Sequence, residues 1–138
     1  MIQKMSHTTI WVLDQERALR FYRDKLGLEV RKDMTMEGGF RWLTLSPKGQ
    51  PDLEIILMPI VEGPHMSKET AEHLRALLNQ GVMGAGVFQT SDCRAAYEEL
   101  KAKGVTFKQG PEERFYGIEA LFQDDEGNWF SMTQPSGV

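Results

Sequence analysis

The sequence predicts an α+β protein built from two tandem copies of one strand–helix–three-strand (βαβββ) module. An apolar, strand-like run ends at Asp14 in the first half and at Ser91-Asp92 in the second, and the two aspartates lie 78 positions apart. A helical pattern follows each aspartate and stops at Gly27 and at Gly104. Apolar runs separated by Gly and Pro follow both helices. One order of signals, repeated in 138 residues, indicates two like modules in one chain.

The two module helices are predicted from their ends and from their apolar spacing. Aspartate is a favoured N-cap, because its carboxylate accepts from unpaired amides of the first turn. Glycine takes the left-handed position after a helix without steric cost. In the first helix, residues 15–26, Ala18, Tyr22 and Leu26 recur every fourth residue and form one apolar face. The second helix is predicted over residues 93–103.

The strands are predicted from apolar runs bounded by turn residues. They lie at 7–13, 28–34, 40–45 and 53–58 in the first copy, and at 85–90, 105–108, 118–123 and 129–133 in the second. Between the copies, Ser67 caps a third helix over 68–79. We therefore expect a single domain with module 1 at about 5–58, a connecting segment at 59–84 and module 2 at about 85–135.

Composition and charge narrow the class of protein. The chain is 41% hydrophobic and 26% charged, as in an ordinary globular protein. A net charge of −4 without a basic cluster argues against a nucleic-acid partner. No apolar run approaches the ~20 residues of a membrane span. The single Cys93 cannot form an internal disulfide, which suits a reducing cytoplasm. We expect a cytoplasmic protein that binds neither nucleic acid nor membrane.

Three segments resemble a known family, the vicinal oxygen chelate superfamily of glyoxalases, bleomycin-resistance proteins and extradiol dioxygenases. They are Phe21-Tyr22-Arg23-Asp24-Lys25-Leu26-Gly27-Leu28-Glu29-Val30, Leu100-Lys101-Ala102-Lys103-Gly104-Val105 and Asp124-Asp125-Glu126-Gly127-Asn128-Trp129-Phe130. Asp125 stands where the family usually has Pro. The resemblance implies that the modules form a curved mixed sheet around a cup-shaped site, with the helices outside. It also implies a homodimer.

The same resemblance supplies a test for a metal site. In metal-dependent members a divalent ion (Zn, Ni, Mn or Fe) is held by a His or Gln on the first strand and a Glu on the last strand of each module. The corresponding residues here are His7 and Glu54 in the first module, and Ala85 and Ser131 in the second. Half of the ligand set is therefore present, and two ligands from one module rarely hold a divalent ion tightly.

The direction in which Glu54 points is open by one residue. Counting from the turn glycines aligns Glu54 with Met132, and counting back from the following prolines aligns it with Phe130. Polarity instead aligns it with Ser131, because Leu53, Ile55 and Leu57 form the apolar face of its strand. A one-residue slip moves every side chain to the other face. We favour the alignment by polarity, with Glu54 facing the cup.

Other residues are candidates for the same site. Glu119 is a carboxylate inside an apolar strand, so it is either solvated or buried with a partner. It could complete a site with His7 and Glu54, and Gln89 could add an oxygen ligand. Arg41 could fork onto an anionic group of a ligand, although surface arginines are common.

The three tryptophans, Trp11, Trp42 and Trp129, are the strongest signal that does not involve a metal. Aromatic side chains on the strands of a cup offer stacking surface to a flat or cationic ligand. The eight methionines add adaptable apolar surface. The alternative is that each tryptophan belongs to a core.

Two functions are consistent with these residues. The first is a small-molecule-binding protein of the bleomycin-resistance type, without an intact four-ligand metal site, in which Ser131, Gln89 and Arg41 accompany the tryptophans. The second is a divalent-metal-dependent lyase or dioxygenase that acts on a vicinal-oxygen substrate. There His7 and Glu54 would bind the metal, and Glu119, Gln89 or a residue of a partner chain would complete its ligands. Glu54 or Glu119 would move a proton. Whether the protein is an enzyme stays open, and nothing in the sequence identifies its ligand.

Overall fold

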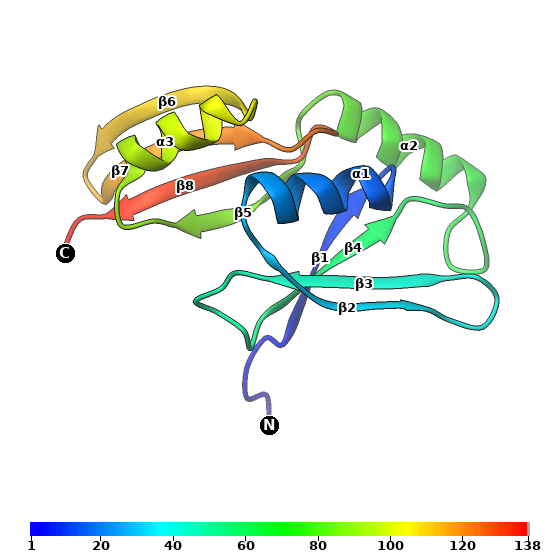
Figure 1. Ribbon diagram of the computed structural model, residues 1–138. Helices are drawn as coiled ribbons and strands as arrows, with labels where there is room; N and C mark the ends of the chain where they lie inside the picture. Colours follow the sequence, from blue (N-terminus) through cyan, green and yellow to red (C-terminus); the bar gives the residue numbers. More distant parts are fainter. Residues whose placement is uncertain (138) are drawn as a thin grey trace. The chain divides into compact units, whose positions relative to one another are not determined.

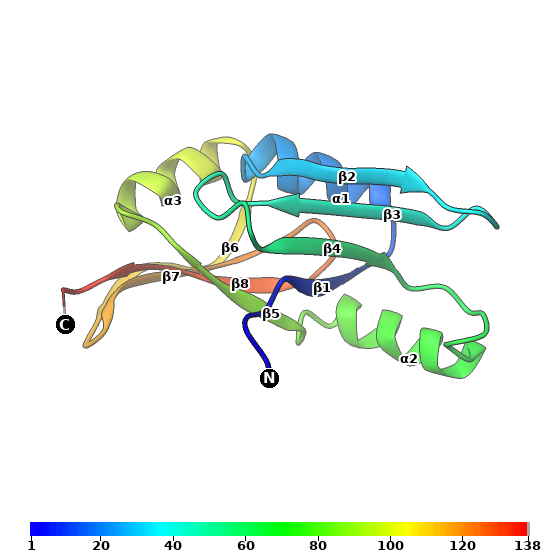
Figure 2. The same ribbon diagram turned by 90° about the horizontal axis from the view of Figure 1, so that it is seen from below.

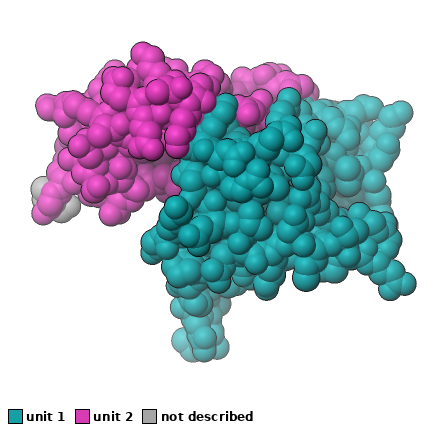
Figure 3. All heavy atoms as spheres, in the orientation of Figure 1, with its two compact units in different colours: residues 1–75 teal, residues 76–138 magenta. Residues whose placement is uncertain are grey.

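The computed structural model describes residues 1–137 and divides into two compact units (Figure 3). Unit 1 comprises Met1–Arg75, and unit 2 begins at Ala76. The division falls inside the segment at 59–84 that the sequence assigns to the connection.

Unit 1 holds the first strand–helix–three-strand module (Figures 1 and 2). Its elements are β1 (His7–Val12), α1 (Gln15–Arg20), the π-helical turn η1 (Phe21–Lys25), β2 (Glu29–Thr35), β3 (Arg41–Ser46) and β4 (Glu54–Pro59). The strands form a sheet in the order β1-β4-β3-β2, in which β1 is parallel to β4 and the other pairs are antiparallel. The predicted order of elements is confirmed.

Alternation along these strands separates two faces, because neighbouring side chains of a strand point to opposite sides. One face is buried together with α1 and η1, and we call it the helix face. It carries Ile10, Val12, Leu43, Leu45, Ile55 and Leu57 from the strands, with Ala18, Leu19, Phe21 and Tyr22 from the helical segment. The opposite face of the sheet is called the open face.

Unit 2 repeats the arrangement. Its elements are β5 (Gly84–Gln89), α3 (Cys93–Ala102), β6 (Thr106–Arg114), β7 (Gly117–Gln123) and β8 (Trp129–Pro135), in the sheet order β5-β8-β7-β6. An aromatic cluster fills its helix face: Phe122 stacks on Phe88 and on Phe130, and Phe107 links Phe122 to Tyr97 of α3. The α+β class with two open, four-stranded mixed sheets is confirmed.

The helix ends follow the predicted chemistry. The carboxylates of Asp14 and Asp92 accept from the amides three residues on, at 3.1 and 3.0 Å. Gly27 and Gly104 adopt positive φ angles of 75° and 88°, which only glycine takes readily. Helix α2 (Lys68–Asn79) begins where Ser67 Oγ accepts from the amide of Thr70 at 3.1 Å. No helix within residues 1–137 is long and apolar enough to span a membrane.

Two elements differ from the sequence prediction. The first helix ends in the π-helical turn η1 instead of continuing as an α-helix to residue 26. Strand β6 extends to Arg114, although the sequence predicts it only to residue 108. Pro111 lies within it, and β6 is an edge strand with register shifts between Phe107 and Gln109 and between Gln109 and Glu112. A proline is tolerated at such irregular edge positions because no regular ladder hydrogen bond is lost.

Candidate functional site

The open face of unit 1 carries two of the three tryptophans. Trp11 of β1 is paired with Met58 of β4, and Trp42 of β3 is paired with Met34 of β2. Both tryptophans are half-buried, whereas their strand neighbours Ile10, Val12 and Leu43 are buried on the helix face. Each indole therefore shares the open face with a flexible methionine.

Glu54 is on the same face and is held by several partners. Thr44 Oγ1 donates to Glu54 Oε1 at 2.7 Å. His7 Nε2 and Lys32 Nζ lie 3.2 and 3.9 Å from Glu54 Oε2. The Thr44 hydrogen bond holds the pKa of Glu54 below its ordinary value; partial burial opposes this, and the charges of Lys32, His7 and Arg31 reinforce it. Glu54 is thus an ionised hydrogen-bond acceptor.

His7 is placed between an acid and an aromatic ring. It is the β1 partner of Glu54 in the parallel ladder, and its ring centroid lies 6.3 Å from that of Trp42. Its other nitrogen, Nδ1, lies 2.9 Å from Ser6 Oγ. The structure therefore brings three predicted site residues together on one face: His7, Trp42 and Glu54.

The open face of unit 2 carries the second carboxylate. Ser131 Oγ donates to Glu119 Oε2 at 2.6 Å, and Tyr116 Oη donates to Glu119 Oε1 at 2.6 Å. Partial burial acts to raise the pKa of Glu119, but these two hydrogen bonds and the charge of Arg114 leave it below its ordinary value. The hydrogen bond to Glu119 raises the pKa of Tyr116. Glu119 is therefore half-buried with hydrogen-bond partners, which lies between the two predicted environments.

The ladders show which positions of the two units correspond. Thr44 pairs with Ile56 and bonds Glu54 two residues earlier; likewise Glu119 pairs with Thr133 and bonds Ser131 two residues earlier. Glu54 therefore corresponds to Ser131, as polarity indicated. Alignment with Met132 or Phe130 is wrong, because both of these residues are buried on the helix face.

The first-strand correspondence needs a correction. His7 pairs with Glu54, and the residue that pairs with Ser131 is Val87, not Ala85. The connection to the helix cap accounts for this difference, because it is two positions shorter in unit 2, with five positions from Val87 to Asp92 against seven from His7 to Asp14. A constant offset of 78 therefore fails in this strand.

The donor set does not fit the four-ligand metal site that the resemblance implies. Val87 offers no ligand atom, and Ser131 offers only a hydroxyl whose proton is directed at Glu119. Both oxygens of Glu54 already have partners within unit 1. Among the described residues, no group of three or more His, Cys, Asp or Glu side chains is arranged to hold a metal ion. The catalytic and metal-binding roles of His7, Glu54 and Glu119 stay predictions.

Trp129 lies on the open face of unit 2 in a packed setting. A side chain at Gly84 would meet Trp129 Cζ2 at 2.8 Å, so the indole packs against the backbone of β5. Lys108 Nζ lies 5.8 Å from the ring centroid and donates to the carbonyl of Gly81 at 2.7 Å. These neighbours restrain the Trp129 indole, which is therefore less free to stack on a ligand.

Gln89, another residue predicted to bind a ligand, is exposed and pairs with Thr133.

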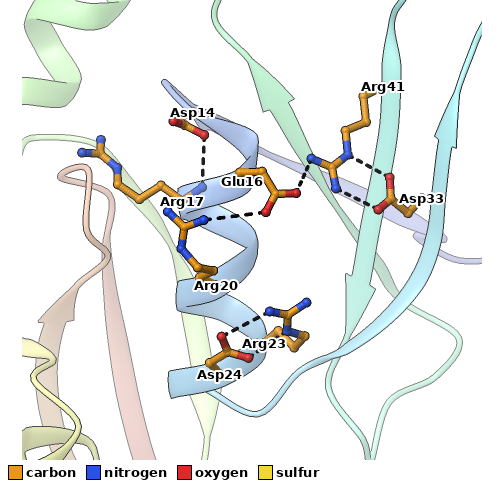
Figure 4. A network of polar contacts seen from close by, with 8 residues as sticks. All are labelled: Asp14, Glu16, Arg17, Arg20, Arg23, Asp24, Asp33 and Arg41. Atoms are coloured by element: carbon orange, nitrogen blue, oxygen red, sulfur yellow. Dashed lines mark hydrogen bonds and ion pairs between the residues drawn. The ribbon is translucent and has the colours of Figure 1, made fainter.

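Arg41 is committed to acids of its own unit. Its Nε and Nη2 donate to the two carboxylate oxygens of Asp33, each at 2.8 Å, and its Nη1 lies 2.9 Å from Glu16 Oε1 of α1 (Figure 4). These partners raise the pKa of Arg41 further. The contacts tie α1 to the β2–β3 hairpin. These contacts do not support the predicted role of Arg41 in ligand binding.

Sequence reasoning missed three hydroxyl groups of these networks, those of Thr44, Tyr116 and Thr133. Their signal is weak, because Thr and Tyr are common in strands for reasons of packing alone. One pattern could have pointed to Thr133: Ser131 and Thr133 are the polar alternation of an otherwise apolar strand.

Comparison with known proteins agrees with this architecture. Residues 4–132 match the family described as Glyoxalase/Bleomycin resistance protein/Dioxygenase superfamily. The chain belongs to this superfamily. It is 36% identical over 132 residues to the uncharacterized protein YurT of Bacillus subtilis (strain 168), covering 95% of this chain and 98% of YurT.

Two solved structures of the superfamily fold are similar over nearly their full lengths. The crystal structure of UcmS2 has a TM-score of 0.91 and 48% sequence identity, covering 97% of this chain and 99% of UcmS2. The crystal structure of TnmS3, described as an antibiotic binding protein from Streptomyces sp. CB03234, has a TM-score of 0.76 and 29% identity, covering 98% of both chains.

Proposed function

We propose that this superfamily member is a small-molecule-binding protein that holds a flat, largely apolar ligand of the antibiotic type against the open faces of its sheets. The observation that carries the proposal is the placement of all three tryptophans on open faces, away from the helix-face cores. The description of TnmS3 as antibiotic binding supports the same class of ligand.

Unit 1 offers the better stacking surface. Trp42 and Trp11 are half-buried there and lie beside Met34 and Met58. Aromatic rings stack against flat ligands, and unbranched methionines adapt to irregular ligand shapes. The faces of tryptophan rings also attract cations, so a flat cationic ligand suits this surface.

A fluorescence titration tests the proposal. Ethidium, a planar aromatic cation, is expected to quench tryptophan emission with a dissociation constant below about 1 mM, an affinity of roughly −4 kcal/mol. Replacing one stacking ring removes about 0.5–1.5 kcal/mol beyond lost area, so Trp42→Leu should weaken binding several-fold. Phe115→Leu is the control, because Phe115 is 93% exposed at the turn between β6 and β7.

Two outcomes count against the proposal. Absence of quenching at near-millimolar ethidium would contradict the proposal that a flat ligand stacks on the tryptophans. Equal weakening by Trp42→Leu and Phe115→Leu would show nonspecific adsorption to exposed aromatic side chains.

The metal-dependent lyase or dioxygenase is the alternative, and the closeness of His7 to Glu54 is the observation that favours it. With only these two residues as ligands, a metal would have to take its remaining ligands from solvent or substrate. We therefore place this function second.

We also propose a cytoplasmic homodimer. The homodimer follows from the family resemblance and is supported by edge strand β2, which is exposed along its whole length and carries Val30 and Met34 at 39% and 48% exposure. Light scattering coupled to size exclusion would measure the mass in solution, and a monomer at micromolar concentration would contradict this part. The cytoplasmic location is supported by the lone, buried Cys93.

A further inference from the structure

The polar side chains on the open face of unit 2 form a chain of hydrogen bonds with a fixed direction. Tyr116 Oη and Ser131 Oγ both donate to the carboxylate of Glu119, at 2.6 Å each. An ionised carboxylate can only accept, and a serine hydroxyl has one proton to give. The proton of Ser131 is therefore committed to Glu119.

This commitment determines the role of Thr133. Its Oγ1 lies 2.8 Å from Ser131 Oγ, and by distance alone either hydroxyl could be the donor. Because Ser131 has no second proton, Thr133 must be the donor. Its own proton is then used as well, while its oxygen keeps a lone pair. The chain of hydroxyls ends at Thr133 Oγ1 as an acceptor that cannot donate.

The ladder places this acceptor beside an apolar row. Thr133 lies in a row between Gln89 of β5 and Glu119 of β7. The next row of the open face consists of Val87, Ser131 and Leu121, and Val87 is 71% exposed. Residues two apart in a strand are separated by roughly 6.6 Å, about the span of one fused aromatic ring system.

We infer that the open face of unit 2 recognises a hydrogen-bond-donating group, a hydroxyl or an ammonium, on a flat ligand, with Thr133 Oγ1 as the acceptor and the Val87–Leu121 row against the apolar part. This rests on the proposed function and adds a chemical class to it. Hydroxyl chains that end on a carboxylate polarise one another, which makes the terminal oxygen a better acceptor. The exposed amide of Gln89 can turn either its oxygen or its nitrogen to the same ligand group.

A pair of matched probes tests this chemistry. 2-Naphthol carries a donor hydroxyl, and 2-methoxynaphthalene has nearly the same shape but can only accept. Both are titrated at pH 7 by protein fluorescence. One net hydrogen bond corresponds to about threefold to tenfold in affinity, so the wild type should prefer 2-naphthol by that factor.

Two variants separate recognition from packing. Thr133→Val keeps the shape but removes the acceptor, and it should abolish the preference while leaving 2-methoxynaphthalene binding unchanged. Ser131→Ala frees the proton of Thr133, so binding of 2-methoxynaphthalene should become tighter. A purely structural role for Ser131 would weaken both probes. Thr106→Val, at an exposed threonine of edge strand β6, is the control and should preserve the preference.

The outcomes distinguish this inference from the proposed function. Equal affinity of the wild type for both probes, or a preference that survives in Thr133→Val, overturns the inference and leaves small-molecule binding intact. Failure of both probes and of ethidium to bind overturns the proposed function and this inference with it. Melting curves of each variant confirm that the compared proteins are folded.

Discussion

The two units pair a hydroxyl with a carboxylate across the same two strand positions, but they place the groups on opposite strands. In unit 1 the hydroxyl is Thr44 on β3 and the carboxylate is Glu54 on β4, 2.7 Å apart. In unit 2 the carboxylate is Glu119 on β7 and the hydroxyl is Ser131 on β8, 2.6 Å apart. Both units thus have a hydroxyl–carboxylate hydrogen bond, but the carboxylate is on the fourth strand of unit 1 and on the third strand of unit 2.

The difference separates what folding requires from what a ligand site requires. A partly buried carboxylate needs a donor, and either arrangement supplies one. However, the first strand of each unit contacts only the fourth. In unit 1 the carboxylate is on the fourth strand, so Glu54 pairs with the first-strand residue His7. In unit 2 the fourth strand carries Ser131, which pairs with Val87, and the carboxylate of Glu119 on the third strand has no first-strand partner in the sheet. The repeat keeps its local bonding and differs in its chemistry.

The largest expected contrast between the units is at their turn glycines. Gly127 has φ of +118°, and a Cβ there would lie 2.1 Å from the carbonyl oxygen of Leu78. Gly49, its counterpart in sequence, has nothing within 4 Å of such a Cβ. We expect Gly127→Ala to lower the free energy of unfolding by at least about 2 kcal/mol, because strained φ and backbone overlap add together.

Gly49→Ala is the matched control and should change stability by no more than about 0.5 kcal/mol. Urea denaturation of both variants provides the measurement. Equal effects at the two positions would contradict the close contact between Gly127 and Leu78.

A medium effect is expected from exchanging the two groups of unit 2. Ser131→Glu alone places a second carboxylate beside Glu119, and Glu119→Thr alone leaves Tyr116 and Ser131 without their acceptor. The double variant restores the arrangement of unit 1. We expect the two changes to couple favourably by about 1–2 kcal/mol in a double-mutant cycle measured by denaturation.

Additive effects of the two changes would show that the hydroxyl–carboxylate pair does not act as a unit. The reciprocal exchange in unit 1, Thr44→Glu with Glu54→Ser, is the comparison. It should couple less favourably, because it also separates the carboxylate from His7 and Lys32.

The Thr44–Glu54 hydrogen bond should also make the stability of the protein depend on pH. The pKa of Glu54 in the folded protein lies below its ordinary value of 4.5, chiefly because Thr44 donates to it. The stabilisation is therefore fully present above the unfolded pKa and is lost as the pH falls through the folded pKa. The stability difference between wild type and Thr44→Val should shrink between pH 7 and about pH 3, and a difference independent of pH would assign it to packing.

Most of the fold could be predicted because it depends on local signals. Caps at Asp14 and Asp92, left-handed glycines and strand alternation each act within a few residues. The polarity of Glu54 against Ile55 and Leu57 was enough to place it on the open face. Family membership followed from three short segments that lie in the right order along the chain.

What could not be predicted depends on register and on bulges. Strand β6 extends through Pro111 with register shifts, and the match of His7 to Val87 follows from a connection to the helix cap that is two positions shorter in unit 2. No fixed offset reveals either feature. The hydrogen bonds from Thr44 to Glu54 and from Ser131 to Glu119 were missed for the same reason, since a bond between neighbouring strands is visible only when their alignment is known. Sequence periodicity reports which face a residue is on and not which residue lies beside it.

The smallest expected effect concerns a metal. The melting temperatures of the wild type and of His7→Ala should both be independent of added Zn, Ni, Mn or Fe(II), because the unit 2 positions that correspond to His7 and Glu54 are Val87 and Ser131. His73→Ala, at an exposed histidine of α2, is the control for nonspecific binding. Elemental mass spectrometry of the untagged protein gives an independent readout. A shift of several degrees with metal in the wild type and in His73→Ala, lost in His7→Ala, would show that His7 is part of a metal site. The ranking of the two proposed functions would then reverse.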